Sequence, residues 1–207
     1  MEITSIEKCK RARGRYNVCL EGRFEFSLSE EVLLESGLKS GDVLSEKDIE
    51  KIKSSDEKRK ALNAAFRFLS FRPRSEKELR DKLSEKSYKS EIIDAAIERL
   101  RELKYIDDED FAKLWIKERM SQKGKIVLRQ ELLKKGIDKK LIEDMLEGIN
   151  TDSELQAAKE LVDKKRGFQR DFEREEAYKK IGGFLLRRGF NYDTVKKIIE
   201  LKTKKSP

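Results

Sequence analysis

One apolar pattern occurs three times along this chain of 207 residues. With Leu83, Leu132 and Leu185 as reference points, apolar residues recur four positions before and ten and fourteen positions after each. Leu132 follows Leu83 by 49 residues and Leu185 follows Leu132 by 53, which indicates one supersecondary unit used three times. The twelve positions that we expect to form the structural core of the repeats are Leu79, Leu83, Ile93, Ile97, Leu128, Leu132, Ile142, Leu146, Ile181, Leu185, Val195 and Ile199.

The spacing within each unit predicts a helix, a tight turn and a second helix. The first two positions of each set are one helical turn apart, and so are the last two. Gly136 and Gly189 fall where the first helix should end, and Asp138 and Asn191 fall where the second should begin. These residue types suit a helix end and a helix N-cap.

The first unit departs from this turn pattern. It has Ser87 in place of the glycine and Lys89 in place of the capping residue. Since a lysine side chain carries no hydrogen-bond acceptor, we expect Ser90 to cap the second helix one residue later.

Another amphipathic stretch precedes each helix pair, over residues 61–69, 111–116 and 155–162. Each unit is therefore expected to contain three helices. Such units bury little apolar surface alone, so stacking of three units into an elongated array is favoured. The alternative is a compact bundle of nine helices with accidental similarity, which the matched positions disfavour.

Residues 1–56 differ in kind from the repeats. Alternating residues at 3–6, 16–20 and 24–28 predict short strands separated by turns. Ser29 is expected to cap one helix, and Ser45 to open a short helix that carries Ile49 and Ile52. The polar run 53–56 is then predicted to connect this segment to the repeats.

The predicted fold is mainly α, with three tandem three-helix repeats preceded by a small β-rich N-terminal segment. The expected boundaries are 1–56 for the β-rich cap, 57–106 and 107–150 for the first two repeats, and 151–207 for the third repeat with a basic C-terminal tail. The tail contains Lys202, Lys204 and Lys205.

Composition agrees with helices, because 43% of residues are charged and only two are proline. The absence of an apolar run of membrane length and of a cleavable leader predicts a cytoplasmic protein. Cys9 and Cys19 are too few and too close for a disulfide framework, so we expect two reduced thiols.

The repeats hold the excess positive charge. Residues 1–56 carry ten Lys and Arg against twelve Asp and Glu, a net charge of −2. Since the whole chain has a net charge of +8, residues 57–207 carry +10. Basic pairs recur just before two repeat turns, and another basic cluster precedes the helix at residue 76. The candidate partner-binding residues are Arg72, Arg74, Lys134, Lys135, Arg187 and Arg188. Solvated helix faces and favourable cations at helix C-termini explain part of this pattern without any partner.

The sequence offers little for catalysis. It contains no histidine, which removes the commonest general base and the usual zinc sites. The acidic run Asp107–Asp110 is best interpreted as a capped helix start rather than a magnesium site. Ser75 and Glu78 have the spacing of a capping box. We therefore expect no enzyme, no metal and no cofactor.

Three segments together resemble the RecX regulatory proteins. They are Arg72–Leu79 followed by Leu83, Tyr105–Ala112, and Leu128 with Glu131–Leu132 and Lys135–Ile137. The resemblance covers about residues 58–200 and includes the order and spacing of the segments. The first two segments together are specific, whereas the third alone is weak.

The resemblance implies a function that periodicity does not. RecX proteins lack known catalytic activity and bind the RecA recombinase and its filament on single-stranded DNA. They inhibit RecA's ATPase, strand exchange and co-protease activity, and so moderate recombination, DNA repair and the SOS response. By resemblance we expect the chain to bind RecA in the filament groove. Arg72 and Arg74 lie in a matching segment, whereas the repeat register alone makes candidates of Lys134, Lys135, Arg187 and Arg188. We expect these six residues to pair with acidic groove residues or DNA phosphates, and we expect a monomer.

Two other interpretations stay open. In the first, the basic array binds single-stranded or duplex DNA directly and affects RecA only through its template. In the second, the repeats are a scaffold for an unrelated partner. Against a stacking mode of DNA binding, the few aromatic residues sit mainly at apolar repeat positions.

Overall fold

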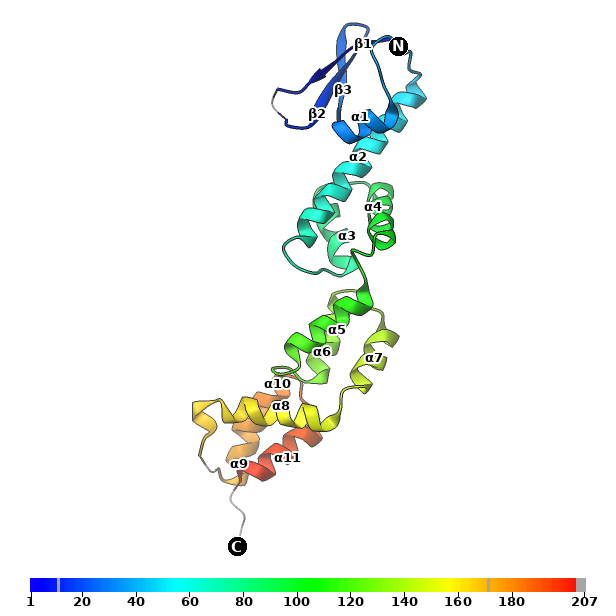
Figure 1. The fold of residues 1–207 in the computed structure, drawn as a ribbon. Helices are drawn as coiled ribbons and strands as arrows, with labels where there is room; N and C mark the ends of the chain where they lie inside the picture. Colours follow the sequence, from blue (N-terminus) through cyan, green and yellow to red (C-terminus); the bar gives the residue numbers. More distant parts are fainter. Residues whose placement is uncertain (11, 171, 204–207) are drawn as a thin grey trace. The chain divides into compact units, whose positions relative to one another are not determined.

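The computed structural model describes residues 1–10, 12–170 and 172–203 and divides the chain into two compact units (Figure 1). Unit 1 comprises Met1–Arg74 and Leu79–Tyr105, and unit 2 comprises Ser75–Glu78 and Ile106–Pro207. Lys204 and Lys205 of the expected basic tail lie outside the described residues. Over the described ranges, no helix is both long enough and apolar enough to cross a membrane.

Unit 1 begins with a three-stranded antiparallel sheet in the order β1 (Ile3–Lys8), β2 (Arg15–Leu20), β3 (Arg23–Ser29). Glu21 and Gly22 both have positive φ, the backbone of a two-residue hairpin turn. Side chains from one face of the sheet pack on α1 (Glu30–Ser36), whose first turn is capped by Ser29 as expected. The three predicted strands are confirmed.

The expected short helix after Ser45 is wrong. Ser45 and Asp48 do form a reciprocal capping box, but α2 runs without a break from Glu46 to Leu69. The polar run 53–56 contains no glycine or proline and stays helical because Asp56 is buried, with only 3% of its surface exposed.

Asp56 joins the sheet to α2. Its carboxylate accepts hydrogen bonds from the Arg15 guanidinium at 2.8 Å and from the backbone N–H of Ser29 at 2.8 Å, and it pairs with Lys60. Burial acts to raise the pKa of Asp56, but the hydrogen bonds from Arg15, Lys60 and Ser29 outweigh burial and lower it below its usual value. The predicted linker is therefore an anchored part of unit 1.

The first repeat consists of the second half of α2 with α3 (Glu76–Ser84) and α4 (Ser90–Glu102). Ser87 takes the left-handed conformation that glycine takes in the other turns, with φ of 61°. The expected cap at Ser90 is wrong, because Lys89 occupies the N-cap position without a side-chain hydrogen bond and Ser90 begins the helix.

Unit 2 holds the second and third repeats. The second consists of α5 (Asp108–Arg119), α6 (Lys125–Lys134) and α7 (Lys139–Glu147). The third begins with α8 (Thr151–Asp163), followed by a 3₁₀ turn η1 (Arg166–Phe168). Its second helix consists of three consecutive segments, which are α9 (Arg174–Ala177), the π-helical η2 (Tyr178–Gly182) and α10 (Gly183–Arg187). Its last helix is α11 (Tyr192–Lys202). The mainly helical fold of three three-helix repeats behind a small sheet is confirmed.

The turn chemistry of unit 2 agrees with the sequence. Asp107, Asp138 and Asn191 each accept hydrogen bonds from first-turn backbone N–H groups, and Gly136 and Gly189 have φ of 82° and 84°. All twelve apolar positions of the repeat pattern are buried, none with more than 7% of its surface exposed. Each repeat thus has its own buried core built from the same repeat positions, and the turns between its last two helices have the same geometry.

A backbone junction joins the third repeat to the second. The N–H groups of Gly124 and Ile126, at the start of α6, donate to the carbonyl oxygens of Arg188 and Gly189 at 2.9 and 3.1 Å. The positive end of α6 therefore meets carbonyls that follow α10, which satisfies N–H groups that a helix start leaves unpaired. Buried Glu154 supports this junction, with its carboxylate 3.4 Å from the Lys125 N–H and 3.4 Å from the Asn191 amide.

The turn of the second repeat makes a related contact with the segment Ser75–Glu78. The Ser75 hydroxyl donates to the Lys135 carbonyl at 2.6 Å and accepts from the Glu78 N–H at 3.3 Å. The first half of the expected capping box is thus confirmed. The first turn of α3 also donates a hydrogen bond to the acidic run, from the Glu76 N–H to the Asp108 carboxylate at 2.8 Å.

The junction at Gly124 has no room for a side chain. A Cβ atom at Gly124 would lie 2.2 Å from the Gly189 carbonyl oxygen, although the φ of Gly124 is an ordinary −79°. We therefore predict that Gly124→Ala destabilises unit 2 by about 2 kcal/mol or more, because backbone must move. Gly148→Ala is the control, since its Cβ would meet nothing closer than 3.6 Å, and its stability should stay within about 0.5 kcal/mol of wild type. Urea unfolding followed by circular dichroism measures both, and equal stability of the two variants would contradict the junction.

Candidate partner interface

The basic cluster between α2 and α3 is partly built into unit 1. The Arg74 Nε–H donates to the Phe68 carbonyl at 3.0 Å, and the guanidinium lies 5.6 Å from the centre of the Phe68 ring. Arg72 is exposed and donates to the carbonyl of its neighbour Pro73 at 2.8 Å. Arg74 therefore closes the loop, while Arg72 is on the surface.

The two lysines at the end of α6 have different environments. The Lys135 ammonium forms an ion pair with Glu78 and lies 4.9 Å from the centre of the Trp115 ring. The side chains of Lys135 and Glu78 are only 23% and 15% exposed. Lys134 is exposed and, among the described residues, has no ion pair or side-chain hydrogen bond. Only Lys134 is therefore available to a partner without breaking an internal contact.

The same division separates the two arginines at the end of α10. Arg188 donates to the Gln122 carbonyl at 3.2 Å and lies 4.8 Å from the centre of the Phe184 ring. Arg187 is exposed and has no ion pair within the described ranges. Lys134 and Arg187 occupy the same repeat position, two residues after the reference leucine.

At the repeat position that follows Lys134 and Arg187, each repeat places a cation over an aromatic ring. Lys86, Lys135 and Arg188 each follow the reference leucine by three residues. Their rings are Phe68 at 5.9 Å, Trp115 at 4.9 Å and Phe184 at 4.8 Å. These cation–ring contacts were not predicted from the sequence, although the shared repeat position of the three cations is a signal that could have indicated them.

Trp115 is held by a network in unit 2. Its indole N–H donates to Glu131 at 3.0 Å, and the Arg119 guanidinium lies 3.7 Å from its ring centre on a side chain that also pairs with Glu131. Glu131 further pairs with Lys123. The cations around Trp115 thus fix the second repeat and are not free for a partner.

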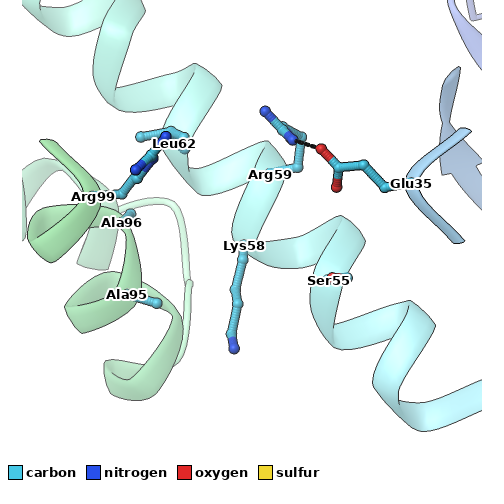
Figure 2. Close-up of a pocket in the computed structure, with 8 residues that line it drawn as sticks. All are labelled: Glu35, Ser55, Lys58, Arg59, Leu62, Ala95, Ala96 and Arg99. Atoms are coloured by element: carbon cyan, nitrogen blue, oxygen red, sulfur yellow. Dashed lines mark hydrogen bonds and ion pairs between the residues drawn. The ribbon is translucent and has the colours of Figure 1, made fainter. Parts of the chain in front are cut away.

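Unit 1 contains a charged cavity of about 270 Å³ beside α2 and α4 (Figure 2). Ala95 and Ala96 of α4 line it together with Lys58 and Arg59 of α2. Arg59 reaches the Glu35 carboxylate, whereas Lys58 extends from α2 in a different direction. The carboxylate of Glu35, which lines this cavity, is therefore neutralised by Arg59 within the site.

The groups that the described residues offer at these sites are exposed cations, ion pairs and backbone hydrogen bonds. The chain has no histidine, and the described residues contain no cluster of three or more metal-ligating side chains. The acidic run at the start of α5 is engaged in capping, since Asp107 accepts hydrogen bonds from the N–H groups of Glu109 and Asp110. The arrangement is suited to a surface that pairs exposed cations with acidic groups.

The three three-helix repeats and the small N-terminal sheet define a helical-repeat protein, and comparisons with known proteins identify its family. Models of the first, second and third three-helix domains of RecX match residues 61–100, 107–146 and 152–199, and the model of the N-terminal domain of regulatory protein RecX matches residues 1–45. This chain belongs to the RecX family of regulatory proteins. The β-rich segment, which the sequence resemblance did not include, is thus part of the family architecture.

Relatives with this name span most of the chain. The regulatory protein RecX of Clostridium perfringens is 32% identical over 200 residues, which are 96% of this chain and 94% of that protein. That of Listeria monocytogenes is 39% identical over 76% of this chain and 60% of its own length. A crystal structure of regulatory protein RecX matches with a TM-score of 0.75 at 30% identity, covering 96% of this chain and 98% of that one. RecX from Lactobacillus salivarius matches 71% of this chain and 97% of its own with a TM-score of 0.63 at 31% identity.

The different roles of Lys134 and Lys135 give a stability prediction. Lys135→Gln removes an ion-pair partner of the largely buried Glu78 carboxylate and should destabilise unit 2 by about 1–3 kcal/mol. Lys134→Gln touches only an exposed side chain and should change stability by no more than about 0.5 kcal/mol. Thermal and urea unfolding of both variants test this, and equal effects would refute the division.

Proposed function

We propose that this chain binds the RecA recombinase and its filament on single-stranded DNA. Binding inhibits the ATPase, strand exchange and co-protease activity of RecA, and so moderates recombination, DNA repair and the SOS response. Membership of a family of regulatory proteins supports a regulatory role. The protein acts by contact with the filament rather than by catalysis.

One observation carries the proposal beyond the family name. Lys134 and Arg187 are exposed, lack internal ion pairs within the described ranges, and occupy the same register in consecutive repeats of unit 2. Equivalent positions on repeated units suit a partner that repeats a subunit, because two contacts on one chain raise the effective concentration of the second. Arg72, the exposed member of its cluster, extends the candidate set into unit 1.

Reversal of the charge at Lys134 and Arg187 tests the contact. We predict that Lys134→Glu combined with Arg187→Glu weakens binding to the RecA filament by about tenfold or more while leaving helicity unchanged. Fluorescence anisotropy of the labelled protein with RecA assembled on single-stranded DNA measures the affinity. Lys135 and Arg188 are excluded from this variant because their side chains hold the fold.

A matched control separates the contact from net charge. Lys159 and Lys197 are also exposed and lie in unit 2 without ion pairs in the described part of the chain. Lys159→Glu combined with Lys197→Glu changes the charge equally and should bind nearly as wild type. Equal loss in both double variants would make net charge the cause and defeat the assignment to Lys134 and Arg187.

Direct DNA binding is the second candidate, and the net charge of +10 on residues 57–207 favours it. In that mode affinity for naked DNA falls steeply with salt, in proportion to the number of phosphates neutralised. The two candidates differ most simply in whether the chain binds RecA when DNA is absent.

A further inference from the structure

Exposed leucines accompany Lys134 and Arg187 of unit 2. Leu133 precedes Lys134 at the end of α6 and is 44% exposed, and Leu186 precedes Arg187 at the end of α10 and is 49% exposed. Both leucines are one residue after a buried reference leucine. The same pair of an exposed leucine and an exposed cation therefore occurs at the same position in two consecutive repeats.

The exposed apolar surface continues along α6. Ile126 is 44% exposed and lies seven residues before Leu133, with exposed Gln130 between them, so the three share one helix face. The opposite side of α6 buries Leu128 and Leu132. A solvent-facing helix side is normally polar, which makes the two aliphatic residues on this side informative.

The backbone junction brings the start of α6 near the end of α10. Ile126 donates its N–H to the carbonyl of Gly189 at 3.1 Å, and the Gly189 N–H donates to the Leu186 carbonyl at 2.9 Å. Two backbone hydrogen bonds thus connect the start of the α6 stripe to the leucine–arginine pair of α10. We call Ile126, Leu133, Lys134, Leu186 and Arg187 the junction surface.

The chemistry of the junction surface favours a protein over a nucleic acid. Single-stranded nucleic acid is bound by aromatic rings that stack on bases, and the junction surface has none. Phosphates need cations but gain nothing from aliphatic neighbours, whereas protein interfaces combine an apolar centre with a polar rim. On a protein partner, carboxylates are the groups complementary to its two cations, Lys134 and Arg187.

We infer that the junction surface binds an acidic protein surface in which carboxylates flank an apolar strip, with Leu133 and Leu186 as apolar anchors beside Lys134 and Arg187. This inference rests on the proposed function, since the acidic partner is then the RecA subunit. It adds the aliphatic residues to the contact and assigns the surface to protein rather than to DNA. The leucines bury apolar area while the cations set orientation.

The test uses the full-length protein with Leu133→Ala and Leu186→Ala together. Both sites are exposed and alanine favours helix, so the fold should be retained. Leu114→Ala with Leu201→Ala is the matched control, because these leucines are 39% and 63% exposed in the same unit. Affinity is measured for RecA filaments on single-stranded DNA and, separately, for naked single-stranded DNA.

We expect the Leu133 and Leu186 variant to bind the filament roughly tenfold more weakly, with affinity for naked DNA unchanged and the control variant near wild type. Unchanged filament affinity in the folded variant, or equal losses for filament and naked DNA, would overturn the inference while wild-type filament binding keeps the proposed function. Failure of the wild-type protein to bind RecA, with or without DNA, would overturn the proposed function and this inference with it.

Discussion

The start of α6 depends on carbonyl groups that another repeat supplies. Gly124 has no side chain to cap the helix, and its N–H and that of Ile126 are bonded to the carbonyls of Arg188 and Gly189. The contact requires glycine on both sides, since a Cβ at Gly189 would lie 2.5 Å from the Val127 nitrogen and its φ is 84°. Two repeats of unit 2 are thus fixed by backbone atoms, which leave little freedom for alternative packing.

This constraint explains why only some basic residues are available to a partner. The residues nearest the repeat turns are used internally, with Lys135 paired to Glu78 and Arg188 bound to the Gln122 carbonyl. The preceding residues, Lys134 and Arg187, form no ion pair or side-chain hydrogen bond in the described part of the chain. In each of these two turns one cation stabilises the repeat, and the cation before it remains exposed to a partner.

Local features of this fold could be predicted from sequence, and features that depend on distant residues could not. The caps at Asp138 and Asn191 follow from chemistry within three residues. The pairing of Lys135 could not be foreseen, because Glu78 is 57 residues away along the chain. The continuity of α2 was missed for the same reason, since Asp56 stays buried through Arg15 on a distant strand.

RecA ATP hydrolysis on saturating single-stranded DNA, followed during titration with this protein, distinguishes contact with the filament from direct DNA binding. If the protein contacts the filament itself, inhibition appears at amounts well below the RecA concentration and is unchanged when more DNA is added. Inhibition that begins only when the protein suffices to cover the DNA, and that extra DNA relieves, would contradict filament contact and indicate direct DNA binding instead.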